Sequence, residues 1–165
     1  MNKFIPFWWI SVLVIFLDQV SKYIVRNIID FGSTNIIKIT ENFFWLTHVQ
    51  NTGAAFSLSF GNIIINKIFF IIFTVVAVVL IVLVSRKSKS QVEKFAFALI
   101  LGGAIGNLID RIVLGSVTDF IWWDFPDFVM QRWPVFNIAD SSIVIALTIL
   151  IVYTLFFNKK KLEEK

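Results

Sequence analysis

The stretch "FNIADSSIVIALTILIVYTLFF", residues 136–157, decides the fold of this chain. It is long and apolar enough to cross a hydrocarbon core about 30 Å thick as a single helix. Asp140 stands near its start, although an unpaired charge at membrane depth costs at least a few kcal/mol. We therefore expect Asp140 to have a partner or a chemical task that the rest of the chain supplies.

The composition of the whole chain is that of an integral membrane protein. Of its 165 residues, 58% are hydrophobic and 16% are charged, and the mean hydropathy is +0.82. A soluble domain has a much higher charged fraction. The absence of cysteine excludes disulfides, thiol catalysis and cysteine-ligated metals. The first apolar run lacks a small-residue cleavage pattern, so we expect a retained span rather than a removed signal peptide.

Windows of about 20 apolar residues predict four membrane-spanning helices. We place them at about 4–25, 67–84, 95–113 and 136–157. The fold class that follows is a mainly α membrane protein, in which residues 1–165 form one domain. The remaining pieces are outer segments 26–66 and 114–135, a cytoplasmic loop 85–94 and a tail 158–165.

Basic residues lie mainly on one side of these spans. Lys3, the loop 85–94 and the tail 158–165 hold nine of the fifteen Lys and Arg residues. By the positive-inside rule, both termini and this loop face the cytoplasm, and the two outer segments lie outside. The net charge of +4 therefore has a membrane explanation, and we expect no nucleic-acid partner.

The two outer segments differ in composition. The first contains β-branched runs such as "STNIIKIT", residues 33–40, which predict a small β-rich element at the membrane surface. We expect His48 to be a surface strand residue there. The second is an aromatic loop with Trp122, Trp123 and Trp133, a composition suited to the lipid headgroup region.

Polar residues of three predicted spans fall at one membrane depth. Counted from the cytoplasmic ends at about 1.5 Å per residue, Asp18 lies about 21 Å along the first span. Asn107 and Arg111 lie about 18 to 24 Å along the third span, and Asp140 lies about 26 Å along the fourth. Asp18 and Lys22 share one helix face, as do Asn107 and Arg111. We expect one polar layer in the outer third of the membrane.

Ordinary structural explanations exist for several of these residues. Asp18 and Lys22 could form an ion pair at the outer interface, and Asp110 could simply end a helix. Asn137 and Asp140 have the spacing of a helix cap followed by an acid in the first turn.

Glycines also have structural explanations. "GGAIG", residues 102–106, contains the Gly-x-x-x-Gly spacing of close helix packing, which is the role we favour. "NTGAAF", residues 51–56, could be an ordinary Asn-x-Gly turn, although its glycine would also allow a bound peptide to approach the backbone.

The residues permit few hydrolytic mechanisms. The chain has no His-Glu-x-x-His and no Gly-x-Ser-x-Gly. Ser21 and Lys22 diverge as helix neighbours. Asp119 and Asp140 lie at the same level, lack another evident partner, and could meet if the aromatic loop folds back. Two close carboxylates share a proton and can activate water for peptide hydrolysis without a metal or cofactor.

Five motifs in this order closely resemble those of the lipoprotein signal peptidases, also called type II signal peptidases. They are "DQVSK" (18–22), "NTGAAF" (51–56), "GGAIGNLIDR" (102–111), "GSVTDF" (115–120) and "FNIAD" (136–140). The resemblance spans nearly the whole chain, including its length and number of spans. No motif position departs from the family pattern.

The resemblance implies a bacterial aspartyl endopeptidase of the cell membrane. Such an enzyme removes signal peptides from lipid-modified prolipoproteins, cutting just before the diacylglyceryl-cysteine at the outer face. The catalytic pair would be Asp119 and Asp140. Further motif residues would position the substrate and orient the pair: Asp18, Lys22, Asn51, Gly53, Asn107, Arg111 and Asn137. We expect a monomer that needs no cofactor, and whose partners are prolipoprotein substrates and membrane phospholipid.

Trp122, Trp123 and Phe125 could form a lid that excludes bulk water from the site.

The competing function classes are a four-span transporter or lipid-binding protein, and an assembly subunit without chemistry. A transporter predicts polar residues along the full membrane depth, whereas the cytoplasmic halves of the predicted spans have few.

Overall fold

The computed structural model describes residues 7–41, 43–53, 62–124 and 133–158. Phe125 of the predicted lid lies outside the described residues. Within the residues that the structure describes, four helices are long and apolar enough to cross a membrane, which confirms the predicted fold class. They are α1 (Trp8–Ile28), α2 (Ile63–Lys87), α3 (Gln91–Val113) and α4 (Ile138–Tyr153), the last extended by a π-helical turn, η2 (Thr154–Asn158).

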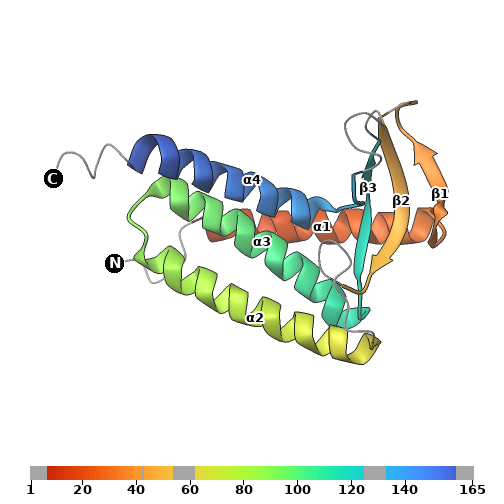
Figure 1. The fold of residues 1–165 in the computed structure, drawn as a ribbon, viewed down its shortest axis with the longest axis horizontal. Coiled ribbons are helices and arrows are strands. Elements are labelled where there is room, and N and C mark those ends of the chain that lie inside the picture. Colours follow the sequence, from red (N-terminus) through yellow and green to blue (C-terminus); the bar gives the residue numbers. More distant parts are fainter. Residues whose placement is uncertain (1–6, 42, 54–61, 125–132, 159–165) are drawn as a thin grey trace.

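A three-stranded antiparallel sheet stands at one end of the helix bundle (Figure 1). Its order is β1 (Gly32–Lys38), β2 (Phe44–Asn51) and β3 (Val117–Trp123). The start of α1, the end of α4 and the α2–α3 connection lie at the opposite end of the bundle (Figure 1). The sheet confirms the predicted β-rich element.

Strand β3 was not predicted, because we assigned its residues to an aromatic loop. Val117, Thr118 and the aromatic residues that follow favour a strand, and β2 supplies the pairing partner. Asp119 therefore lies in a strand rather than in a loop. Asn51 pairs with Val117, two residues before Asp119, which places the Asn51 side chain diagonally across from that carboxylate.

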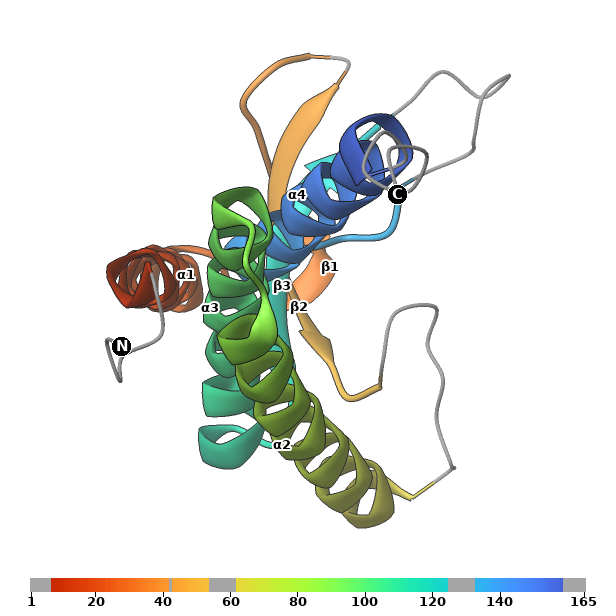
Figure 2. The same cartoon turned by 90° about the vertical axis from the view of Figure 1, so that its left-hand side faces the viewer.

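Helix α3 occupies the middle of the bundle and packs against the other three helices (Figure 2). A Cβ added at Gly103 would lie 2.4 Å from the backbone oxygen of Ala139 in α4. One added at Gly106 would lie 2.7 Å from a carboxylate oxygen of Asp18 in α1. Only glycine permits these approaches, so the packing role predicted for residues 102–106 is confirmed.

Candidate active site

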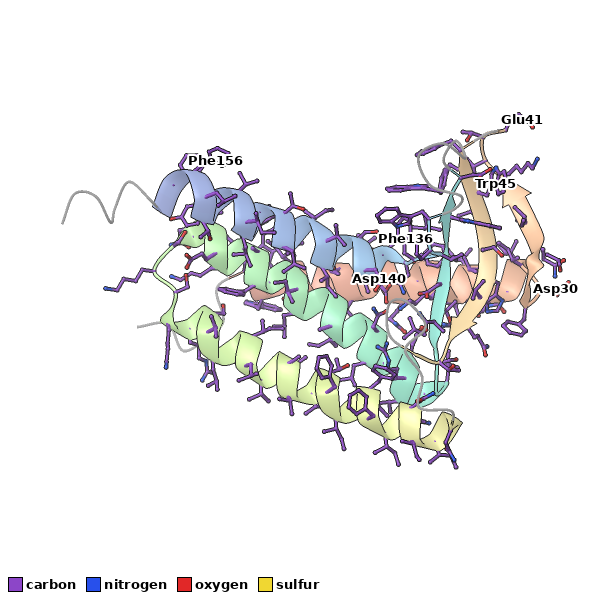
Figure 3. The ribbon with its side chains drawn as sticks, viewed as in Figure 1. Asp30, Glu41, Trp45, Phe136, Asp140 and Phe156 are labelled. Atoms are coloured by element: carbon purple, nitrogen blue, oxygen red, sulfur yellow. The ribbon has the colours of Figure 1, made fainter. Side chains whose placement is uncertain are left out.

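The sheet end of the bundle contains a group of buried polar side chains. We call it the polar cluster, and it consists of Asp18, Lys22, Asn107, Asp110, Thr118, Asp119 and Asn137. Asp140 and Arg111 are half-buried beside it. Figure 3 shows Asp140 at the sheet end of α4, close to Phe136. The predicted polar layer therefore brings together side chains from three helices and β3.

Asn137 joins the two candidate catalytic aspartates. Its side-chain nitrogen Nδ2 donates a hydrogen bond of 2.6 Å to Asp119 Oδ1. Its backbone N–H donates one of 3.2 Å to Asp140 Oδ2. Asn137 Oδ1 in turn accepts from the Asp140 backbone N–H at 2.9 Å, which completes the predicted capping arrangement at the start of α4. The capping residues thus belong to the site as well as to the helix.

Each of the two aspartates also accepts a hydrogen bond from another asparagine. Asn51 Nδ2 donates to Asp119 Oδ2 at 3.1 Å, and Asn107 Nδ2 donates to Asp140 Oδ1 at 2.8 Å. Asn51 Oδ1 accepts from the Gly53 backbone N–H at 3.0 Å, so the predicted Asn-x-Gly turn is present and orients the amide. The expectation that the two aspartates lack other partners was wrong, because each accepts hydrogen bonds from asparagines. These partners are neutral amides, which a search for charged partners does not find.

The environment of Asp119 favours its protonated form. Burial, and then the neighbouring Asp140 carboxyl, raise the pKa of Asp119 from 3.8 to about 7. Hydrogen bonds from Asn51 and Asn137 and the charge of Lys22 oppose this rise in pKa. A carboxyl with a pKa near 7 can hold or release a proton at neutral pH, as acid–base chemistry requires.

Lys22 lies fully buried among three acceptors. Its Nζ is 2.8 Å from Asp18 Oδ2, 2.9 Å from Asn107 Oδ1 and 3.4 Å from Asp110 Oδ2. The predicted ion pair between Asp18 and Lys22 exists, and both side chains are 0% exposed. Through its contacts with Asn107 and Asp110, Lys22 connects α1 to α3 inside the bundle.

Arg111 connects the turn after β2 to α3. Its Nη2 donates to the Gly53 carbonyl at 3.3 Å, and its Nη1 donates to the Asn107 carbonyl at 3.5 Å. The guanidinium carbon lies 5.5 Å from the centre of the Phe70 ring in α2. Gly53 is thus held through both its N–H and its carbonyl.

Asp110 was underestimated, because it does more than end a helix. It is 1% exposed and accepts hydrogen bonds from the Thr118 backbone N–H at 2.9 Å and from Gln19 Nε2 at 3.2 Å. Arg26, whose Nη1 lies 3.6 Å from Asp110 Oδ1, was also missed. The spacing of Asp18, Lys22 and Arg26 at every fourth residue is a helical stripe that could have revealed it.

Other predicted residues lie outside the polar cluster. His48 is in β2 as expected, but it is buried rather than at the surface, and its Nδ1 lies 2.9 Å from the Ile29 carbonyl oxygen. Trp122 is buried in β3 with its ring edge-on to Trp45, and Trp123 packs against Phe136. The structure therefore places both tryptophans in the sheet, and their role as a lid stays a prediction.

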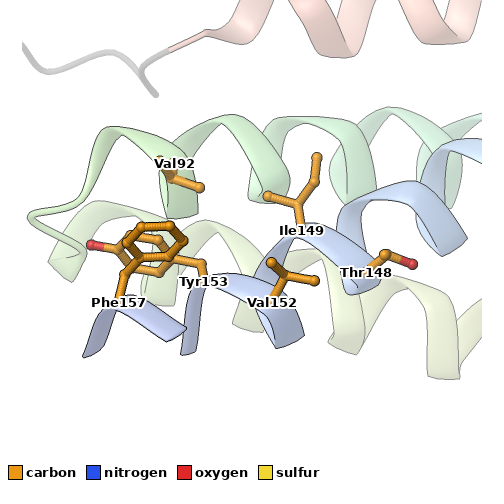
Figure 4. A pocket seen from close by; sticks show the side chains of 6 residues that line it. All are labelled: Val92, Thr148, Ile149, Val152, Tyr153 and Phe157. Atoms are coloured by element: carbon orange, nitrogen blue, oxygen red, sulfur yellow. The ribbon is translucent and has the colours of Figure 1, made fainter. Parts of the chain in front are cut away.

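The opposite end of the bundle has a different character. An apolar groove lies there between the start of α3 and the end of α4 (Figure 4). It is lined by Val92, Thr148, Ile149, Val152, Tyr153 and Phe157. Its lining contains no charged side chain, so the acids and bases of the polar cluster have no counterpart in this groove.

Fold and site together define a multi-pass membrane protein in which Asn137 joins a buried and a half-buried carboxylate at one end of a four-helix bundle. Residues 10–156 match the family described as "Signal peptidase (SPase) II", and the chain belongs to that family. Members of this family are proteases that process lipoproteins. Family membership favours the enzyme over the transport and assembly alternatives.

Individual relatives agree with this assignment. The chain is 39% identical to the lipoprotein signal peptidase of Borreliella afzelii over 150 residues, covering 89% of this chain and 88% of the relative. It is 37% identical to that of Enterococcus faecalis over 162 residues, covering 98% and 94%. A solved structure, described as a bacterial membrane enzyme determined in meso at 2.3 Å resolution, superposes with a TM-score of 0.79 at 33% identity, covering 93% of this chain and 89% of the other.

Proposed function

We propose that this lipoprotein signal peptidase is an aspartyl endopeptidase whose catalytic dyad is Asp119 and Asp140. It cleaves diacylglyceryl-modified prolipoproteins just before the lipidated cysteine, at the extracytoplasmic face of the bacterial cell membrane. The observation that carries the proposal is that Asn137 contacts both carboxylates, through its side chain and through its backbone N–H. Asp18 and Asp110 also share a neighbour, but that neighbour is the cation Lys22, whose charge favours ionised carboxylates.

The charge balance around the dyad supports a single shared proton. Four carboxylates gather here, those of the dyad, Asp18 and Asp110, together with three cations, Lys22, Arg26 and Arg111. With all of them ionised the group would carry one excess negative charge, and one proton on the dyad makes it neutral. Buried charge is unfavourable unless balanced, so the singly protonated dyad is the favoured state.

The singly protonated dyad can hydrolyse an amide without a metal ion. The ionised carboxylate takes a proton from a water molecule as that water attacks the scissile carbonyl carbon. The protonated carboxyl donates its proton to the developing oxyanion. The carboxyl that took the water proton then gives it to the leaving nitrogen as the C–N bond breaks, and the other carboxylate takes a hydroxyl proton from the intermediate, which restores the singly protonated dyad. Asn51 and Asn107 hold the two carboxylates in fixed orientations throughout these steps.

The location of the dyad suits a substrate anchored in the membrane. A signal-peptide helix and two acyl chains would hold the scissile bond near the interface. Asp119 lies in β3, and Asp140 lies at the sheet end of α4 (Figure 3). Arg111 donates a hydrogen bond to the Gly53 carbonyl, and Asn51 donates one to Asp119, so the turn after β2 lies beside the dyad. The enzyme acts as a monomer among membrane phospholipids, and its sheet end faces outward, since the basic loop at the other end favours the cytoplasm.

The experiment that tests this function is cleavage of a purified prolipoprotein with and without its diacylglyceryl group. We expect cleavage only of the lipidated substrate, between the cysteine and the residue before it. Equal cleavage of both substrates would contradict the proposed specificity. Inhibition by a chelator would contradict the metal-free mechanism.

A second experiment tests the orientation in the membrane. A reporter inserted at Thr34 should be extracytoplasmic and one fused after Phe157 cytoplasmic, and the reverse would contradict the proposed orientation.

A further inference from the structure

Two acids outside the dyad bind backbone N–H groups at equivalent places. Asp110 Oδ2 accepts from the Thr118 N–H at 2.9 Å. Asp18 Oδ1 accepts from the Ala139 N–H at 3.0 Å. Thr118 and Ala139 each stand immediately before one aspartate of the dyad. The two hydrogen bonds therefore fix the chain one residue ahead of each reacting carboxyl.

Lys22 joins these two acids. Its ammonium group lies 2.8 Å from Asp18 Oδ2 and 3.4 Å from Asp110 Oδ2. Each of the two carboxylates thus contacts both Lys22 and one backbone N–H. The three side chains therefore form one continuous link between the two backbone segments. We call Asp18, Lys22 and Asp110 the backbone clamp. It runs from the start of α4, through α1 and α3, to β3.

The three side chains of the backbone clamp are buried. Asp18 and Lys22 are 0% exposed and Asp110 is 1% exposed, so bulk water cannot replace their contacts. Gly106 allows Asp18 to lie against α3, since a Cβ there would be 2.7 Å from Asp18 Oδ2. Ala139 lies in the first turn of α4, where backbone N–H groups have no acceptor within the helix and favour a negative charge.

We propose that Asp18 and Asp110 are positioning residues that set the separation of the two dyad carboxyls through the Thr118 and Ala139 backbones, and that Lys22 holds these two acids at a fixed distance. This inference rests on the proposed function, because it takes Asp119 and Asp140 as the dyad. Among the described residues no hydrogen bond or ion pair joins the clamp to the dyad carboxyls, although the charge of Lys22 opposes the rise that burial causes in the pKa of Asp119. The clamp acts by placement, and a displacement of about 1 Å in a catalytic group can lower a rate on the order of 100-fold.

Kinetics of alanine variants provide the first test. Asp110→Ala and Asp18→Ala should each lower kcat on the order of 100-fold with KM nearly unchanged, because the dyad is misplaced while the substrate still binds. Asp110→Asn keeps one acceptor oxygen and should recover part of kcat. The exposed Asp30 provides the control, since Asp30→Ala removes a carboxylate near the sheet without touching the clamp. An increase in KM alone would contradict positioning.

Hydrogen exchange of two amides gives a test that needs no activity. Protein labelled with ¹⁵N at threonine or at alanine is purified in detergent, and exchange of the labelled amide hydrogens is followed by NMR. Asp110→Ala should speed exchange at Thr118 and not at Ala139, Asp18→Ala should do the reverse, and Lys22→Met should speed both. General destabilisation would speed both amides in every variant, and that pattern would overturn the inference.

The two proposals fail in different ways. If Asp119→Asn cleaves normally, the dyad is wrong, whatever the amides do. If Asp119→Asn is inactive while Asp110→Ala retains full kcat and a protected Thr118 amide, the clamp is wrong and the dyad stands. Where an alanine variant does not fold, the asparagine variants decide: unchanged kcat and unchanged exchange in both Asp18→Asn and Asp110→Asn would overturn the clamp.

Discussion

Helices α2 and α3 are consecutive and pack against each other, yet they meet different surroundings (Figure 2). In its most apolar window, α2 has 11% of residues buried, whereas α3 has 44%. The surface of α2 consists largely of exposed Ile, Val, Leu and Phe. Helix α3 instead presents glycines to α1 and α4, and Asn107 and Asp110 to the polar cluster.

This difference in surroundings determines which side chains are acceptable at the positions of each helix. Most of the α2 surface is exposed and apolar and suits contact with lipid, so a large apolar side chain is acceptable at most of its positions. Protein surrounds α3, where close packing demands small residues and each polar group needs a partner. The span with the strongest hydrophobic signal therefore contributes least to the site, whereas the less hydrophobic α3 contributes Asn107, Asp110 and Arg111.

The largest effect should follow from removing the carboxyls that α3 helps to support. Asp119→Asn and Asp140→Asn preserve size while removing acid–base function, so each should lower kcat by several orders of magnitude. The double variant should be scarcely worse than either single variant, because the two residues act as a unit. Turnover of lipidated substrate by purified protein measures this, with Val79→Ile in α2 as a control expected to be fully active.

The next largest effect concerns packing. Gly103→Ala adds one methyl group that would lie 2.4 Å from the Ala139 carbonyl oxygen. We expect a loss of about 1–3 kcal/mol from overpacking, which outweighs the gain of about 1 kcal/mol in helix propensity. Val79→Ile also adds one methyl, but Val79 is 51% exposed on α2 and should change stability by less than about 0.5 kcal/mol. Thermal unfolding in detergent compares the two variants, and equal shifts would refute the contrast.

These contrasts also show what could be predicted from the sequence. The four spans were predictable because hydropathy reports directly whether a segment can cross lipid. Strand β3 was not, because its assignment depends on pairing with β2, which no local window contains. Helix α2 begins at Ile63, four residues ahead of the predicted span, because Asn62 caps it through hydrogen bonds to two backbone N–H groups.

The site was predictable in part for similar reasons. Asp119 and Asp140 stand out because isolated acids beside apolar segments need an explanation, and the motifs strengthen that inference. Asp110 does not stand out, because an acid followed by an arginine at a helix end is ordinary. Its importance comes from the Thr118 N–H and from partners on α1, which only the folded structure brings to it.

A smaller effect should follow from changing the shape of one cation. Arg111→Lys keeps the charge but loses the planar fork that reaches the Gly53 and Asn107 carbonyls together. Losing one charge-assisted hydrogen bond should lower turnover about tenfold. Comparing kcat/KM of this variant with that of Lys67→Arg in α2 tests it, and normal turnover by Arg111→Lys would leave this cation only a topological role.

The last effect concerns folding stability, which the burial of the Asp119 carboxyl lowers when that group ionises. The pKa of Asp119 is about 7 in the fold, against 3.8 for the ordinary carboxyl expected in the unfolded chain. Between these values the unfolded chain has released its proton and the folded protein still holds it, so stability decreases as pH rises from about 4 to about 7. Above pH 7 both states have lost the proton, so stability no longer changes with pH through this group and the full loss of stability remains.

Asp119→Asn should remove this pH dependence, because an amide has no proton to exchange. The inactive variant should therefore unfold at a higher temperature than the parent at pH 8, by roughly 2–4 °C per kcal/mol recovered, and the difference should shrink toward pH 5. Thermal unfolding in detergent across this range measures it, with Asp30→Asn as the exposed control. Parallel curves for parent and Asp119→Asn would mean that Asp119 titrates alike in both states, and that its burial does not oppose the stability of the fold.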